Sequence, residues 1–238
     1  MRSRLLLPAL LTAGLLLSGC TGSSDSSGGS DGSDGGGGSD LAARLADAKK
    51  TLDTAETIDI SLSTKSVPDG VTGLLSATGK GNHSPAFEGK VTVVTGGASL
   101  GADVIATGGK VYAKTGFTPD FAPIDPADLK APDPAALLQA DGGITSILTS
   151  TDGLAEDGQS RDGKDVLTSI KGTLPGSIVS TIIPSASPSK DFTVTYRLDD
   201  DDVLRDATIT GPFYPGDASV TYVVALETSD TPVTIKAP

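Results

Sequence analysis

The chain has 238 residues, with 30 acidic against 18 basic side chains and a formal net charge of −12. This balance argues against a nucleic-acid ligand and against adsorption to an anionic membrane surface. The only cysteine, Cys20, excludes an intrachain disulfide, so an exported domain would depend on its hydrophobic core alone.

The first 20 residues predict an export signal that ends in a lipid-modified cysteine. Two arginines precede an apolar run, Leu5 to Leu16, which is too short to span a bilayer as a helix. The following Leu17-Ser18-Gly19-Cys20 resembles the lipobox of bacterial lipoproteins. That resemblance implies that residues 1–19 are removed and that Cys20 carries a thioether-linked diacylglycerol, often with a further N-acyl chain, on the outer face of the cell membrane. The alternative is an ordinary signal peptide with an incidental cysteine.

A low-complexity segment follows the cysteine. Residues 21–39 contain only Gly, Ser, Asp and one Thr. Because nothing in this segment can be buried, residues 20–39 are expected to form a disordered linker behind the lipid anchor. As a flexible coil the linker would have an end-to-end distance of roughly 25 Å. Residues 40–238 are long enough for a single domain with a substantial core.

The first predicted element of this domain is a helix over residues 41–55, capped at its N-terminus by Asp40. Apolar residues recur along it at spacings of three and four, as on one face of a helix: Leu41, Leu45, Ala48, Leu52 and Ala55. The pattern then changes to strict alternation of apolar and polar residues around Ile60, which predicts a half-buried strand.

Further strand patterns follow one another with glycine turns and no helix between them, which predicts an antiparallel meander. These strands are expected over residues 73–81, 86–95, 98–107 and 110–115. Five prolines then interrupt residues 116–154, where only two short helices are predicted, at 133–138 and 143–148. A connection of this length in a compact domain is usually functional.

The second half of the domain is predicted to return to antiparallel strands. Asp162-Gly163 is a strong hairpin signal, and a short helix is expected over residues 176–183. The strands are placed at 154–161, 164–174, 191–198, 203–210, 219–227 and 233–236. The expected fold class is therefore α+β: a large curved antiparallel sheet of about nine or ten strands with several helices on one face.

Several short motifs, in their order and spacing, resemble one family of lipoproteins. They are Gly116-Phe117, Ile124-Asp125-Pro126, Asp133-Pro134 followed by Leu137-Leu138, Thr210-Gly211-Pro212-Phe213-Tyr214 and Pro232-Val233-Thr234-Ile235. Together with the lipobox they resemble the actinobacterial LppX/LprA/LprF/LprG lipoproteins, and LprG most of all. The resemblance implies a half-barrel sheet closed by helices over an apolar cavity for the acyl chains of lipids or glycolipids bound for the outer envelope. It also suggests a membrane transporter as a partner.

The residues themselves offer little chemistry for catalysis. His83, the only histidine, lies in a predicted turn, where we expect it to be solvated. The acidic run Asp199 to Asp202 lacks the glycine and glutamate spacing of a calcium loop and is expected to be a solvated hairpin tip. We therefore expect no enzyme, no catalytic residue, no metal and no cofactor; a surface hydrolase is disfavoured because its histidine or metal chemistry is missing.

The favoured function is transfer of acylated lipids by a membrane-anchored carrier. Candidate cavity-lining residues are inward strand positions and helix residues: Ile58, Ile60, Leu62, Val91, Val93, Val104, Leu137, Leu138, Ile144, Ile147, Leu148, Ile178 and Ile182. A register error of one residue would reverse which strand face lines the cavity. The alternative is an envelope scaffold or partner-binding lipoprotein with a solid core and no lipid ligand.

Overall fold

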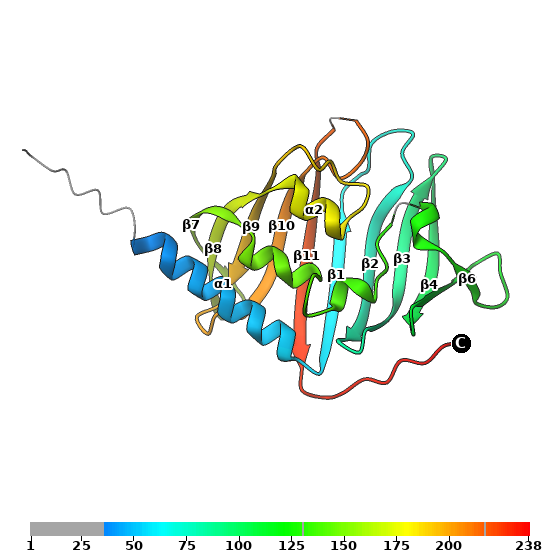
Figure 1. Ribbon diagram of the computed structural model, residues 1–238, viewed down its shortest axis with the longest axis horizontal. Helices are drawn as coiled ribbons and strands as arrows, with labels where there is room; N and C mark the ends of the chain where they lie inside the picture. The colour runs from blue at the N-terminus through cyan, green and yellow to red at the C-terminus, as the bar shows by residue number, and fades with distance from the viewer. Residues whose placement is uncertain (1–35, 130, 217) are drawn as a thin grey trace, which may run out of the picture. The chain divides into compact units, whose positions relative to one another are not determined.

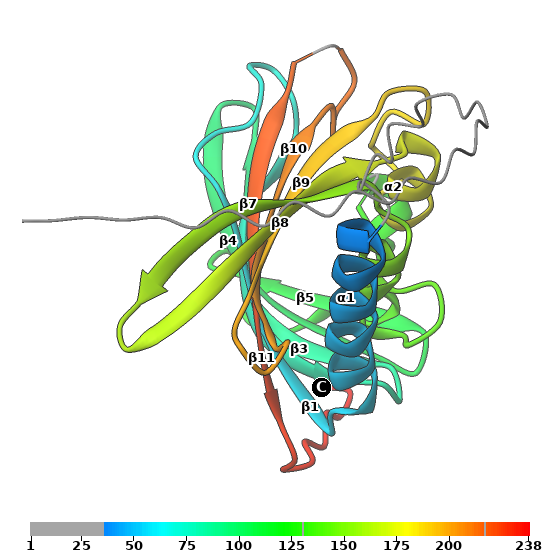
Figure 2. The ribbon, with the colours of Figure 1, turned by 90° about the vertical axis from the view of Figure 1, so that its left-hand side faces the viewer.

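The computed structural model describes residues 36–129, 131–216 and 218–238, which belong to one unit, Asp34–Pro238. The predicted signal peptide, Cys20 and most of the predicted linker lie outside the described residues. An 11-stranded antiparallel sheet carries helices on one of its two faces (Figures 1 and 2). The expected antiparallel sheet with helices on one face is confirmed, with 11 strands in place of nine or ten. No helix of the described residues is long and apolar enough to span a membrane.

Two meanders make up the sheet. The first runs outward from its centre: β1 (Thr57–Thr64), β2 (Gly73–Asn82), β3 (Ala86–Thr95), β4 (Ala98–Thr107), β5 (Lys110–Thr115) and β6 (Ala122–Ile124). The second runs inward from the opposite edge: β7 (Asp152–Asp162), β8 (Asp165–Leu174), β9 (Phe192–Leu198), β10 (Leu204–Gly211) and β11 (Val220–Ser229). Pairing of β1 with β11 joins the two meanders, so the sheet has β6 at one edge and β7 at the other.

This topology explains the long proline-rich connection. The chain ends its first meander at one edge of the sheet and must begin the second at the opposite edge, so the connection crosses the whole face (Figure 1). It carries three 3-10 helices: η1 (Pro126–Leu129), η2 (Ala136–Leu138) and η3 (Ile144–Thr149). The sequence missed β6, which has only three residues and contains Pro123; proline is tolerated there because β6 is an edge strand.

Two α-helices complete the layer on this face. α1 (Gly36–Thr54) packs against η3 and β7, and α2 (Gly176–Ile182) follows β8. The predicted apolar stripe is confirmed, since its four residues in α1 and Ala55, just beyond the end of α1, are all buried. The predicted N-cap at Asp40 is wrong, because α1 begins at Gly36 and so extends into the predicted linker.

The predicted last strand, 233–236, is not a strand. A new strand needs a free neighbour, and both sides of β11 are already paired, with β1 and β10. Side chains hold the segment instead: Thr57 Oγ1 donates to the carbonyl oxygen of Thr231 at 2.7 Å, and Asn82 Nδ2 donates to that of Val233 at 2.9 Å. Ile235 is buried, which accounts for the alternating apolar pattern there.

A pair of glycines shapes the helix-bearing face of the first meander. Gly79 and Gly89 face each other across β2 and β3, and the ring of Phe87 lies over both. A Cβ atom at Gly89 would lie 2.6 Å from Cζ of that ring and 2.3 Å from the carbonyl oxygen of Thr78. Only glycine permits this close approach of an aromatic ring to the backbone of the sheet.

Candidate functional site

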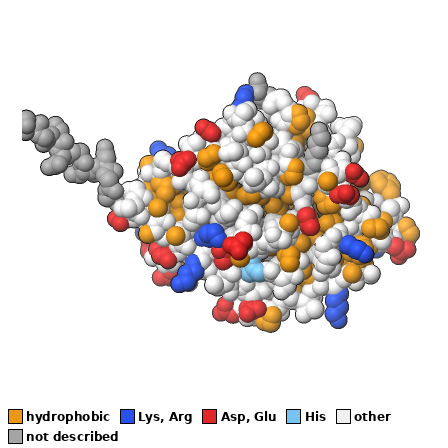
Figure 3. Space-filling model, viewed as in Figure 1, with side chains coloured by type: hydrophobic (Ala, Val, Ile, Leu, Met, Phe, Trp, Pro, Cys, Tyr) orange, Lys and Arg blue, Asp and Glu red, His pale blue; other side chains and the backbone are white. Residues whose placement is uncertain are grey.

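A row of apolar side chains lies on the helix-bearing face of the first meander. Leu62, Ala77, Val91 and Ala102 are paired in sequence across β1, β2, β3 and β4, and we call these four residues the apolar strip. They share a face with the buried Phe87, because residues two apart on a strand point the same way. All four are only partly buried, and Figure 3 shows hydrophobic side chains reaching the surface of this face. The strip is therefore an apolar surface within reach of a ligand.

Under the helices of the second meander, the same face encloses a small apolar void of about 10 Å³. Its walls come from α1, η3 and strands β9 to β11: Leu52, Ile144, Thr145, Ile147, Leu148, Tyr196, Leu204, Ala207, Ile209, Val224 and Leu226. A space of this size is about that of one water molecule. In this conformation the void therefore has no room for an acyl chain, and the helix layer is packed down on the sheet.

A buried hydroxyl network ties η3 to the floor of this void. The hydroxyl of Thr151 donates to the carbonyl oxygen of Ile147 at 2.7 Å and accepts a hydrogen bond from the hydroxyl of Tyr196 at 2.8 Å. Burial raises the pKa of Tyr196 well above its usual value, since ionisation would place a charge among apolar side chains. Tyr196 thus stays neutral and keeps its hydrogen bond across the physiological pH range.

The candidate cavity residues from the sequence largely meet on the helix-bearing face. Except for Val93 and Ile178, they belong to the core or pack against it: Ile58, Ile60, Leu62, Val91, Val104, Leu137, Leu138, Ile144, Ile147, Leu148 and Ile182. Val93 and Ile178 are half-buried and lie outside this cluster. In α2 the buried residue beside Ile178 is Val179. Only three of the candidates, Ile144, Ile147 and Leu148, border the void.

Sequence reasoning missed the floor of the void, which is formed by β9, β10 and β11. β9 carries the two largest fully buried side chains of the described residues, Tyr196 and Phe192. Their signal was present, because buried and more exposed residues alternate strictly along β9 and along most of β11. A candidate list based on that alternation would have included Tyr196 and Val224.

Polar contacts fasten the helix layer to its surroundings. Arg44 pairs with Asp202 and donates to the carbonyl oxygen of Asp199 at 3.1 Å, which holds α1 to the β9–β10 turn. Lys49 pairs with Asp53 and also donates to the carbonyl oxygen of Ala140 at 3.2 Å. Rearrangement of the helix layer would have to break such contacts.

The β9–β10 turn is only in part the solvated acidic tip that the sequence predicts: Asp200 and Asp201 are exposed, whereas Asp199 is not. The carboxylate of Asp199 is buried and accepts from the backbone amides of Asp201 and Val203 at 3.0 and 2.9 Å. Its other oxygen pairs with Arg205 at 2.9 Å. Asp199 therefore stabilises the turn, and the described residues contain no cluster of three or more side chains suited to hold a metal ion.

His83 also departs from its expected solvated state. It lies in the turn between β2 and β3 but is half-buried, and both of its ring nitrogens face backbone carbonyl oxygens. Nδ1 lies 2.6 Å from the oxygen of Leu138 in η2, and Nε2 lies 2.9 Å from the oxygen of Leu52 in α1. The ring therefore joins the turn to two helices of the covering layer.

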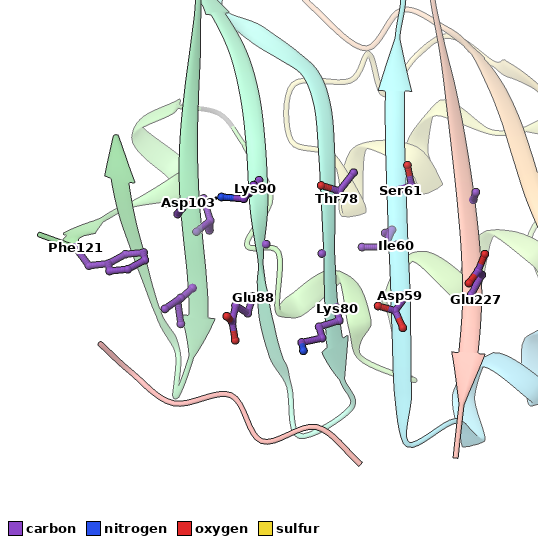
Figure 4. Close-up of a pocket in the computed structure, with 15 residues that line it drawn as sticks. Asp59, Ile60, Ser61, Thr78, Lys80, Glu88, Lys90, Asp103, Phe121 and Glu227 are labelled. Atoms are coloured by element: carbon purple, nitrogen blue, oxygen red, sulfur yellow. Dashed lines mark hydrogen bonds and ion pairs between the residues drawn. The ribbon is translucent and has the colours of Figure 1, made fainter. Parts of the chain in front are cut away.

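The opposite face of the sheet has an open hollow of about 710 Å³ with a very different lining (Figure 4). Charged side chains from neighbouring strands alternate across it, as in the row Asp59, Lys80 and Glu88. A hydrogen bond from Lys90 lowers the pKa of Asp103 at its border. Exposed ion pairs of this kind contribute little to stability. Because charged side chains line this open hollow, the helix-bearing face is the better candidate for an apolar ligand.

Comparison with known proteins agrees with this fold. The family model for LppX_LprAFG lipoproteins matches residues 40–236. The crystal structure of LprF from Mycobacterium bovis is similar with a TM-score of 0.67 and 16% identity, over 84% of this chain and 97% of that one. The crystal structure of lipoprotein LppX from Mycobacterium tuberculosis is similar with a TM-score of 0.60 and 18% identity, over 83% and 99%. A comparison with curated protein sequences finds no match.

Proposed function

Because this chain belongs to the LppX_LprAFG lipoprotein family, we propose that it binds acylated lipids or glycolipids and carries them toward the outer cell envelope. A lipoprotein family implies an exported, membrane-associated protein. In this proposal the lipid on Cys20 holds the chain at the outer face of the membrane, and the linker gives the domain its reach. The proposal includes a membrane transporter as the partner of such a carrier.

The apolar strip is the observation that carries the proposal. A sheet face buried under helices usually has large side chains, whereas Ala77, Val91 and Ala102 leave a half-buried apolar surface. Each methylene buried against such a surface contributes about 0.8 kcal/mol, so a long acyl chain binds firmly without polar contacts. The head group would then remain near the solvent, and selectivity among head groups would be low.

Full burial of an acyl chain requires the helix layer to move. The void between η3 and strands β9 to β11 has a volume of about 10 Å³, so an acyl chain enters it only as α1 and η3 separate from the sheet. We propose that the ligand first lies along the apolar strip and then extends under the helices. The residues that wall the void, such as Leu52 and Ile147, would become ligand contacts in the loaded state.

The solid-core alternative has one observation in its favour, which is the same close packing. A scaffold lipoprotein without a lipid ligand would have a filled core of this kind. Native mass spectrometry of the protein purified from its own membrane separates the two functions. A carrier retains non-covalent lipid adducts beyond the mass of the acylated chain, and a solid-core scaffold has none.

A substitution on the strip tests the site itself. Val91→Trp places a large ring among the small side chains of the strip, and we expect uptake of a pyrene-labelled phospholipid from vesicles to fall several-fold. Because Val91 is half-buried, the melting temperature should change by only a few degrees. Thr92→Trp is the matched control, since neighbouring residues of a strand point to opposite faces. Undiminished uptake by Val91→Trp would contradict the proposed site.

A further inference from the structure

His83 connects three parts of the fold that are distant in sequence. It is the only histidine of the chain (pale blue in Figure 3), and its two carbonyl partners are 55 and 31 residues away. One partner, Leu138, belongs to η2, and the other, Leu52, belongs to the last turn of α1. The ring therefore holds two separate helices of the covering layer to the β2–β3 turn.

Both partners accept hydrogen bonds and neither can donate one. A neutral imidazole has a single N–H group and satisfies one carbonyl, while the lone pair of its other nitrogen faces the second oxygen. Only the imidazolium donates from both nitrogens. We propose that His83, protonated on both nitrogens, is a latch that fastens the end of α1 and η2 to the sheet, and that loss of one proton releases one of the two attachments.

The end of α1 favours a positive charge at this place. Carbonyl groups in the last turn of a helix lack helical partners and carry partial negative charge. The oxygen of Leu52 is one of these groups and also accepts from the backbone amide of Ala55 at 3.3 Å. A protonated ring within hydrogen-bonding distance of this oxygen gains from the helix dipole as well as from the hydrogen bond.

No acidic partner competes for this role among the described residues. The β2–β3 turn and η2 contain no charged side chain, and Asp133 and Asp141 flank η2 on its two sides. On α1, Lys49 and Asp53 pair with each other, and Glu56 just beyond α1 is exposed. None of these groups forms an ion pair with His83. The hydrogen bonds to the two carbonyl groups are thus the contacts that change when His83 gains or loses a proton.

The latch lies where the apolar strip and the void would be joined. The side chain of Leu52 borders the void, while its carbonyl oxygen faces the histidine. Leu138 is packed so closely on β2 that a Cβ atom at Gly81 would lie 2.1 Å from its Cδ1. Release of either residue would loosen the cover of the void and of the adjacent sheet. The link between the latch and access to the void rests on the proposed lipid-carrier function, whereas the latch itself does not.

A single histidine makes the protonation state directly measurable. We expect ring ¹⁵N resonances of the purified protein to show two N–H groups at pH 5.5 and one at pH 8. The hydrogen-exchange protection of the Ala55, Leu138 and Gln139 amides, corrected for intrinsic exchange, should fall about fivefold over the same range, as for one net hydrogen bond. Amides of β9 and β10 serve as internal controls. The latch would be overturned if the ring carried only one N–H group at pH 5.5. It would also be overturned if the exchange protection of these amides did not change as the ring loses its proton.

Two variants refine the test. His83→Gln removes the titration and should make the protection of these amides independent of pH between 5.5 and 8. Lys49→Gln removes a neighbouring attachment, the contact with the carbonyl oxygen of Ala140, and should keep the wild-type pH dependence. If His83→Gln retains that dependence, another group is responsible and the proposal is wrong. The wild-type resonances decide the matter even if a variant folds poorly.

Lipid uptake tests the coupling to function. With vesicles of phosphatidylcholine containing a pyrene-labelled phospholipid, we expect wild-type uptake to be several-fold faster at pH 8 than at pH 5.5, and His83→Gln to show no such difference. Equal wild-type rates at the two pH values would overturn the coupling. Absence of uptake at every pH would instead refute the proposed carrier function, while the ring and amide measurements would still decide whether the latch exists.

Discussion

Tyr222→Phe should destabilise the domain far more than the loss of one oxygen suggests. The hydroxyls of Tyr214 and Tyr222 form a closed ring with the backbone of Leu74: the amide of Leu74 donates to Tyr214 at 2.9 Å, and Tyr222 donates to the carbonyl oxygen of Leu74 at 2.5 Å. The two hydroxyls are 2.5 Å apart, so Tyr214 donates to Tyr222. Leu74 lies beyond the last pair between β1 and β2, which is Ser63 with Ser76, so the tyrosines replace a missing strand neighbour.

The magnitude follows from the groups left without partners. The substitution removes two hydrogen bonds and leaves the carbonyl oxygen of Leu74 and the O–H donor of Tyr214 without partners, which together cost about 2–3 kcal/mol. For a domain of this size the melting temperature should fall by roughly 5–10 °C. Tyr112→Phe is the matched control, because the half-exposed Tyr112 makes no hydrogen bond to the described residues through its hydroxyl. It should change stability by less than about 0.5 kcal/mol.

Thermal and urea unfolding of the wild type, both single variants and Tyr214→Phe would test this reasoning. Tyr214→Phe should cost a similar amount, and the double variant should cost clearly less than the sum, because the two hydroxyls belong to one network. A loss for Tyr222→Phe no larger than that for Tyr112→Phe would refute the importance of the ring. Additive losses for the two buried tyrosines would show that they act independently.

Three further outcomes are expected. Gly89→Ala should cost about 1–3 kcal/mol or more, since its Cβ would meet the Phe87 ring and a backbone oxygen, whereas Gly101→Ala in β4, with nothing within 4 Å, should be nearly neutral in the same unfolding assay. Burial keeps the pKa of Tyr196 and Tyr222 above that of an unfolded tyrosine, so the unfolded state loses its protons first as the pH rises. The free energy of unfolding should therefore fall by roughly 1.4 kcal/mol per tyrosine for each pH unit well above pH 10. An unchanged free energy of unfolding at pH 11 would contradict this. Cys20→Ser should release the protein from membranes into the medium, and fractionation that finds it still membrane-bound would argue against the lipid anchor.

Local patterns in the sequence were sufficient for most of the sheet. β3, β4 and β5 begin and end at the residues that the alternation and the glycine pairs predict, because each of these hairpins is specified by residues close in the chain. The stripe of α1 was equally clear, since a helix face depends on spacing alone. The start of α1 at Gly36 could not be predicted, because a run of glycine and serine has low helix propensity.

Features that depend on contacts between distant segments were not accessible in the same way. Nothing in Gly81 to Pro85 indicates that His83 meets the carbonyl groups of Leu52 and Leu138, which are brought there by the packing of α1 and η2. The short β6 likewise exists because β5 offers it a free edge. The position of the void depended on which meander lies under η3, and sequence pattern does not determine this.

The two meanders differ in the size of the side chains that they present to the helices, and this difference bears on function. Strands β8 to β10 fill their side of the core with Leu, Ile, Phe and Tyr, including Ile170, Leu174 and Phe192, which are fully buried. On the same face of the sheet, β2 to β4 present Ala77, Gly79, Gly89 and Ala102. Folding of the first meander therefore leaves apolar surface that its own side chains do not cover, although covering it with larger residues would add stability. Val91→Trp should reveal what that surface serves: if a Trp on the strip raises the melting temperature and abolishes lipid uptake, the small side chains are retained for the ligand at the expense of the fold.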